Sequence, residues 1–119
     1  MHELSIAGAV VEICCDNARG GTVVKVELKI GRLRQVVPDA LAFAFELTAE
    51  GTPVEGALLE IEDVPARVAC GACELETEVE RFPLACGRCG SSAVEVVGGE
   101  ECQVESLEIE HAPVLVARR

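Results

Sequence analysis

Two pairs of cysteines are the residues of this chain whose type and spacing most clearly predict chemistry. The stretches CGAC (70–73) and CGRCG (86–90) each hold a C-x-x-C pair, and twelve residues separate the pairs. Two thiolates on one tight turn can bind the same metal, and a second turn completes a tetrahedron around it. Soft thiolates in this geometry select zinc, or iron in a rubredoxin-like site. The predicted ligands are Cys70, Cys73, Cys86 and Cys89. Four protein ligands leave no open position, so the site should be structural rather than catalytic.

The same four cysteines are compatible with more than one class of protein. Iron in the same site would make the chain an electron carrier, and a zinc ribbon can also serve as an interaction or nucleic-acid module. Core cysteines are a further alternative, whereas a thioredoxin-like redox pair needs a βαβ context that is absent here. Cys14, Cys15 and Cys102 have no motif partner. Of the adjacent Cys14 and Cys15, we expect one to pack inward as a small hydrophobic residue.

A second candidate site lies at the amino terminus, where the chain begins MHE and holds one of its two histidines. The Met1 amine, the amide nitrogens of His2 and Glu3, and the His2 imidazole are within bonding reach of one metal. Such a planar nitrogen set suits Ni(II) or Cu(II) better than zinc. The first N–H groups of a helix have no intrahelical acceptor, so ionising them breaks no helical hydrogen bond. The alternative is a solvated histidine near a chain end.

Composition narrows the possible partners. The chain has 119 residues, a net charge of −11, three Phe and neither Trp nor Tyr. So acidic a protein is a poor ligand for nucleic acid or for an anionic membrane surface, and a basic partner or a cation fits better. No stretch approaches the roughly 20 apolar residues of a membrane span, and the first residues do not resemble a secretory signal. We therefore expect a cytoplasmic protein with reduced thiols.

Hydrophobic periodicity predicts the elements that position these residues. A helix over 2–18 has an apolar stripe, and a second helix over 38–49 begins at Pro38. The stripe of the first helix comprises Leu4, Ala7, Val11, Cys14 or Cys15, and Ala18. The stripe of the second comprises Leu41, Ala44, Phe45 and Thr48, widened by Phe43 and Leu47.

Three strands are predicted over 22–30, 57–64 and 101–110, with Val24, Val26, Leu28 and Ile30 on one face of the first. The last strand changes phase near 105–106, which would be explained by a β-bulge or by pairing of 102–104 in one sheet and 107–109 in another. The prediction is an α+β fold with two helices on a three-stranded sheet and an inserted, zinc-ribbon-like four-cysteine domain. Its domains are 1–65, 66–99 (inserted) and 100–119.

Four stretches together resemble the HypA/HybF family of hydrogenase nickel-incorporation metallochaperones. They are MHELSIA at the start, KIGRLRQVVPDALAFAFE (29–46), the paired cysteine segment, and VESLEIE (104–110). The four stretches occur in the order found in the family, and together they span nearly the whole chain. One departure is Glu74, which follows the second cysteine where many zinc knuckles have glycine.

The resemblance implies a metallochaperone, and no catalytic turnover is expected because the sequence shows no nucleophile–base pair and no open metal site. It implies a nickel site on Met1, His2 and Glu3, to which Asp39 at the start of the second helix is added, and a structural zinc on the four cysteines. It also implies delivery of Ni(II) to the large-subunit precursor of [NiFe]-hydrogenase with a HypB-type GTPase, which is an ATPase in some lineages; some members also serve urease. No family role falls on His111, which we expect at the surface. The sequence leaves open a monomer or a weak homodimer.

Overall fold

The computed structural model describes residues 2–111, which form two compact units. Within that range the first unit comprises 2–27, 37–60 and 104–111, and the second comprises 28–36 and 61–103. The second unit thus includes residues on both sides of the predicted insertion, 66–99. Met1, a predicted nickel ligand, lies outside the described residues.

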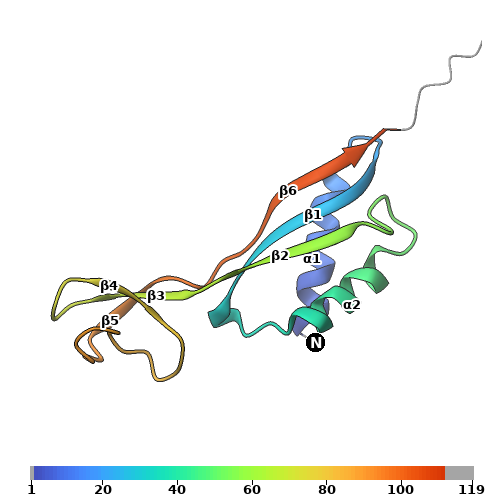
Figure 1. Ribbon diagram of the computed structural model, residues 1–119. Helices are drawn as coiled ribbons and strands as arrows, with labels where there is room; N and C mark the ends of the chain where they lie inside the picture. Colours follow the sequence, from blue (N-terminus) through green and yellow to red (C-terminus); the bar gives the residue numbers. More distant parts are fainter. Residues whose placement is uncertain (1, 112–119) are drawn as a thin grey trace, which may run out of the picture. The chain divides into compact units, whose positions relative to one another are not determined.

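The structure contains the two helices and the three-stranded sheet that were predicted; both helices belong to the first unit, and each strand of the sheet has residues in both units (Figure 1). The helices are α1 (His2–Asp16) and α2 (Pro38–Ala49), and they pack against each other. The sheet has the order β2-β1-β6, from β1 (Thr22–Gly31), β2 (Leu58–Val64) and β6 (Cys102–Glu110). No helix among the described residues is both long and apolar enough to cross a membrane.

Each helix buries one narrow stripe. In α1 the buried residues are Ala7, Val10, Val11 and Cys14, and in α2 they are Leu41, Ala44, Phe45 and Ala49. The predicted stripes were too wide, because Leu4, Phe43 and Leu47 are exposed. Periodicity marks every apolar position on a helix, but a two-helix layer over one sheet covers only the side of each helix that faces the sheet and its neighbour.

Strand β1 buries Val26, Leu28 and Ile30, as the alternation predicts. The alternation slips at the start of the strand, where Val23 rather than Val24 is fully buried and its N–H donates to the Pro53 carbonyl at 2.8 Å. In β6 the half-buried residues are Val104, Leu107 and Ile109. Their uneven spacing agrees with the predicted change of phase near 105–106.

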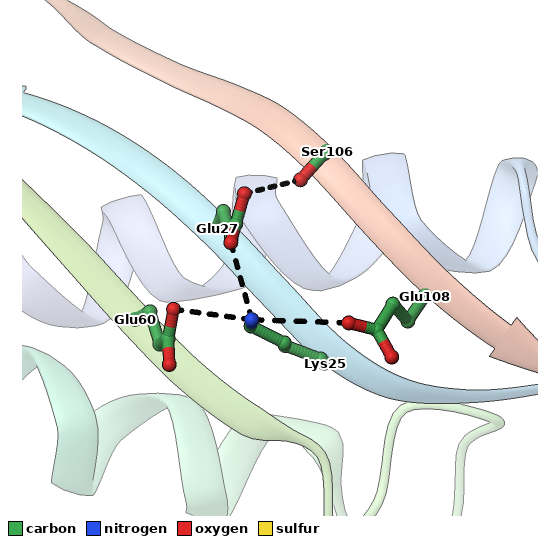
Figure 2. Close-up of polar contacts among 5 residues, drawn as sticks. All are labelled: Lys25, Glu27, Glu60, Ser106 and Glu108. Carbon is green, nitrogen blue, oxygen red and sulfur yellow. Dashed lines mark hydrogen bonds and ion pairs between the residues drawn. The ribbon is translucent and has the colours of Figure 1, made fainter.

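The polar face of this sheet carries three carboxylates around one ammonium group (Figure 2). The Nζ of Lys25 lies 3.2 Å from Glu27, 3.3 Å from Glu60 and 3.8 Å from Glu108. Ser106 Oγ donates to Glu27 at 2.6 Å. The Ser106 hydroxyl and then Lys25 lower the pKa of Glu27, while Glu27 and then Glu60 raise the pKa of Lys25. One cation thus holds three strands' acidic side chains together.

The second unit contains a sheet that periodicity did not reveal. Strands β3 (Ala66–Cys70), β4 (Glu76–Val79) and β5 (Val94–Gly98) form an antiparallel sheet in the order β4-β3-β5. Pro65 separates β2 from β3, as expected of a residue that ends a strand. The strands have four or five residues, too short to show an alternation in the sequence.

A close backbone crossing lies at the start of η1, the 3₁₀ turn Arg32–Arg34 of the second unit. The Gly31 N–H donates to the Glu101 carbonyl at 2.7 Å, and the Leu33 N–H donates to the Gly99 carbonyl at 2.9 Å. A side chain at Gly31 would collide with the Gly99 carbonyl. Gly99 itself has φ of 103°. Only glycine allows these two segments to approach so closely.

Candidate metal centre

The four predicted cysteines come together from two turns of the second unit, one after β3 and one between β4 and β5. The Sγ atoms of Cys70 and Cys89 lie 3.6 Å apart, as do those of Cys73 and Cys86. All four Sγ atoms lie within 4.8 Å of one another. Four sulfurs about 2.3 Å from one zinc would be separated by about 3.8 Å in a tetrahedron. The donor set therefore fits a single tetrahedral metal.

Two turns of the same design present these sulfurs. The N–H groups of Ala72 and Cys73 point at Cys70 Sγ, both at 3.3 Å. In the second turn the N–H groups of Arg88 and Cys89 point at Cys86 Sγ, both at 3.4 Å. Backbone donors aimed at sulfur stabilise the thiolate form that binds metal.

Each turn closes with a residue in the left-handed region. In the second turn this is Gly90, with φ of 77°, whose N–H donates to the Cys86 carbonyl. In the first turn it is Glu74, with φ of 64°, whose N–H donates to the Cys70 carbonyl. The departure from glycine noted in the sequence therefore keeps the geometry of the turn, at a conformational cost of about 1 kcal/mol.

The four thiols differ in acidity. The Cys73 N–H lowers the pKa of Cys70, and the Cys89 and Arg88 N–H groups lower that of Cys86 to about 6. For Cys73 the Leu75 N–H lowers the pKa, but desolvation and the neighbouring thiols outweigh it and raise the pKa to about 11. For Cys89 the Ser91 N–H also lowers the pKa, but the Cys70 thiol and desolvation outweigh it, so the pKa of Cys89 is raised. Binding a metal to all four must therefore displace protons.

The remaining cysteines stand apart from this cluster. Cys14 is fully buried in α1, which confirms that one of the adjacent pair packs inward. Burial, and then the neighbouring Cys15, raise its pKa to about 11. Cys102 is exposed in β6. Within residues 2–111, the four clustered cysteines form the one group of metal-ligating side chains close enough to share an ion.

The amino-terminal candidate site lies at the start of α1. His2 is its first residue and is exposed. The Val37 N–H donates to Glu3 Oε2 at 3.0 Å, and this bond lowers the pKa of Glu3. Val37 directly precedes Pro38 and Asp39, so the bond holds the starts of the two helices together (Figure 1). No periodic pattern pairs residues 34 positions apart, and this contact was not predicted. His111 is exposed, as expected.

The fold and the cysteine cluster define a small α+β metal-binding protein. Its residues 1–109 match the family model described as hydrogenase/urease nickel incorporation, metallochaperone, HypA. The chain belongs to this family.

Similar proteins and solved structures agree with this family assignment. A hydrogenase maturation factor HypA from Geobacter sulfurreducens is 46% identical over 110 residues, 92% of this chain and 100% of that protein. One from Nostoc sp. is 39% identical over 114 residues, 96% of this chain and 100% of that one. A solution structure of the nickel metallochaperone HypA from Helicobacter pylori is 25% identical, with a TM-score of 0.68, and covers 94% of this chain and 100% of that chain.

Proposed function

We propose that this chain binds Ni(II) at its amino terminus and delivers it to the large-subunit precursor of [NiFe]-hydrogenase. The ligands are the Met1 amine, the amide nitrogens of His2 and Glu3, and the His2 imidazole. Asp39 provides a carboxylate beside them. The observation that supports this assignment is the start of α1 at His2, joined through Glu3 to the start of α2, in a chain whose family is named for nickel incorporation.

The local structure favours release as well as binding. An amine, ionised amides and an imidazole would hold a metal in one plane, which selects Ni(II) over the tetrahedral preference of zinc. His2 is exposed, so a partner can reach the ion. The Glu3 carboxylate already accepts the Val37 N–H, so Glu3 contributes to nickel through its amide nitrogen, while its side chain positions the helix start.

The four cysteines, on this proposal, hold a structural Zn(II). Their sulfurs are close enough for one tetrahedral ion, and each pair is supported by its own backbone donors. A closed four-sulfur site has no position for substrate, so the zinc stabilises the second unit and performs no reaction. The chain acts as a carrier rather than an enzyme. Its partners are a HypB-type GTPase (an ATPase in some lineages), the hydrogenase precursor and, in some settings, urease maturation proteins, in the cytoplasm where thiols stay reduced.

Nickel titration of the untagged protein tests the amino-terminal site. His2→Ala should abolish the absorption band of planar Ni(II) and leave zinc content unchanged. An amino-terminal extension should act in the same way, because it removes the free amine. Glu3→Gln keeps the amide and should keep the band, with affinity within about threefold. Equal nickel affinity in His2→Ala and the parent would refute the site, and loss of the band in Glu3→Gln would refute the amide assignment.

An iron-binding electron carrier is the alternative for the four-cysteine site, since its geometry suits either metal. The purified protein decides between them. One equivalent of zinc in a colourless protein supports the structural site, whereas visible iron–thiolate absorption that bleaches on reduction would support the electron carrier.

A further inference from the structure

Helix α2 exposes an apolar stripe that is separate from its buried face. Ala40, Phe43 and Leu47 follow one another at intervals of three and four residues, so they line one side of the helix. Phe43 is 65% exposed and Leu47 is 48% exposed. Because the buried face of α2 uses other residues, this stripe contributes nothing to the core of the unit.

The stripe continues toward the start of the two helices. Val37 at the N-cap of α2 is 56% exposed, and Leu4 in the first turn of α1 is 54% exposed. The Val37 N–H donates to the side-chain carboxylate of Glu3, the residue that precedes Leu4. Four large exposed apolar side chains thus lie along α2 and at the end where the proposed nickel ligands are found. An exposed apolar patch of this kind marks an interaction surface.

Acidic side chains border this stripe. Asp39, Glu46 and Glu50 are exposed and follow one another at intervals of seven and four residues, which places them in a row beside Phe43 and Leu47. Neither α1 nor α2 contains a lysine or an arginine. A second copy of this chain would bring a second acidic row against the first, so the charge disfavours self-association and favours a basic partner.

An open recess of about 410 Å³ lies at the carboxyl end of α2. Glu46, Glu50 and Glu55 line it, together with Phe45, Ala49 and the turn at Gly56 and Ala57. The carboxyl end of a helix carries partial negative charge, which adds to that of the three carboxylates. The recess has the size and charge to accept the end of a lysine or arginine side chain.

We propose that the exposed face of α2 docks an amphipathic helix of the nickel-delivery partner, whose apolar ridge is flanked by Lys and Arg. The apolar ridge packs on Phe43 and Leu47, and one basic side chain enters the recess. The 12 residues of α2 span about 18 Å, so a partner helix seated along it reaches from the recess to the proposed nickel ligands. This inference rests on the proposed function, because it assigns a contact face to the partner that works with the nickel site.

Binding of the purified HypB-type GTPase to the zinc-loaded, untagged chain, measured by calorimetry, tests the proposal. Phe43→Ser with Leu47→Ser removes the ridge contact, and Glu46→Lys with Glu50→Lys reverses the charge. Each pair should weaken binding at least tenfold. Leu58→Ser and Glu95→Lys are matched controls, because they change an exposed leucine and an exposed glutamate on strands instead, and should stay within twofold of the parent.

The outcomes separate the docking face from the nickel site. All these variants should retain the nickel absorption band, helical circular dichroism and zinc content, since none changes a proposed ligand or a buried residue. His2→Ala should lose nickel but still dock in the absence of the metal. Three outcomes would each overturn the docking proposal. The first is that both double variants of α2 bind the GTPase within twofold of the parent, and the second is that the parent shows no measurable binding. The third is that the parent forms a dimer that the Phe43 and Leu47 changes dissociate.

Discussion

The Val37 N–H donates a hydrogen bond of 3.0 Å to the Glu3 carboxylate. This contact joins the first turn of α1 to the N-cap of α2, two residues before Asp39. It gives the Glu3 side chain a role in the fold that is independent of metal, and it brings the start of the second helix to the proposed nickel ligands. Its dependence on pH offers a direct test.

Glu3 should make stability depend on pH in the acid range. Its pKa is lowered, first by the Val37 N–H, from the usual 4.5. A carboxylate with a lowered folded pKa stabilises the protein above its unfolded pKa, and this contribution is lost as the pH falls through the folded value. Glu3→Ala should therefore lower the melting temperature at pH 6 and have little effect well below pH 4. Glu12→Ala, an exposed change in the same helix, is the control; an equal loss from both at pH 6 would contradict the prediction.

Zinc loading of the metal-free protein should release at least two protons near pH 7.5, because zinc binds thiolates and at least two of the four thiols still hold their protons. These are Cys73, with a pKa of about 11, and Cys89, whose pKa is also raised, whereas Cys86 at about 6 is already ionised. Calorimetry in buffers of different ionisation enthalpy counts the protons, and apparent affinity should rise with pH.

Cysteine substitutions provide the controls for the zinc site. Cys73→Ser should lose zinc and the hydrogen-exchange protection of β3, β4 and β5, because the second unit depends on the metal. Cys102→Ser, an exposed cysteine outside the cluster, should keep both. Release of no protons on loading, or full zinc content in Cys73→Ser, would speak against a four-thiolate site.

Two glycine-to-alanine changes should have opposite effects. At Gly31 a methyl group meets the Gly99 carbonyl at the backbone crossing, and relieving this collision should cost about 3 kcal/mol of unfolding free energy. Gly8 lies inside α1 with nothing within 4 Å of an added Cβ outside the helix backbone. Alanine there should stabilise the protein by about 1 kcal/mol through helix propensity. Denaturant unfolding measures both, and a neutral Gly31→Ala would show that the crossing is not tight.

Lys25→Gln should lower the melting temperature, because it leaves Glu27, Glu60 and Glu108 to repel one another on the polar face of the first sheet (Figure 2). The loss should shrink in 1 M salt, where the screening length falls to about 3 Å. Adding Glu60→Gln to Lys25→Gln should recover part of the stability. An equal loss at low and high salt would attribute the effect to packing of the lysine stem instead of charge.

Much of this molecule is determined by local sequence. The helix that starts at Pro38, the alternation of β1 and the spacing of Cys70, Cys73, Cys86 and Cys89 each express a rule that acts over a few residues. The two helices, three strands and cysteine cluster were therefore predicted, and the α+β fold is confirmed. The strands of the second unit escaped prediction because four or five residues are too few to show a period.

Only the tertiary structure decided which apolar side chains are buried and which polar groups are hydrogen-bonded over long range. Periodicity placed Leu4, Phe43 and Leu47 on buried stripes, but the helix layer leaves them exposed, because burial depends on what lies opposite. The bond from Val37 to Glu3 and the approach of Gly31 to Gly99 join residues far apart in the chain. The sequence alone thus determined the two helices, the strands of the first sheet and the chemistry of the metal ligands. Packing decided what surrounds the amino terminus and which face of α2 is left for a partner, since long-range contacts leave no repeating pattern in one chain.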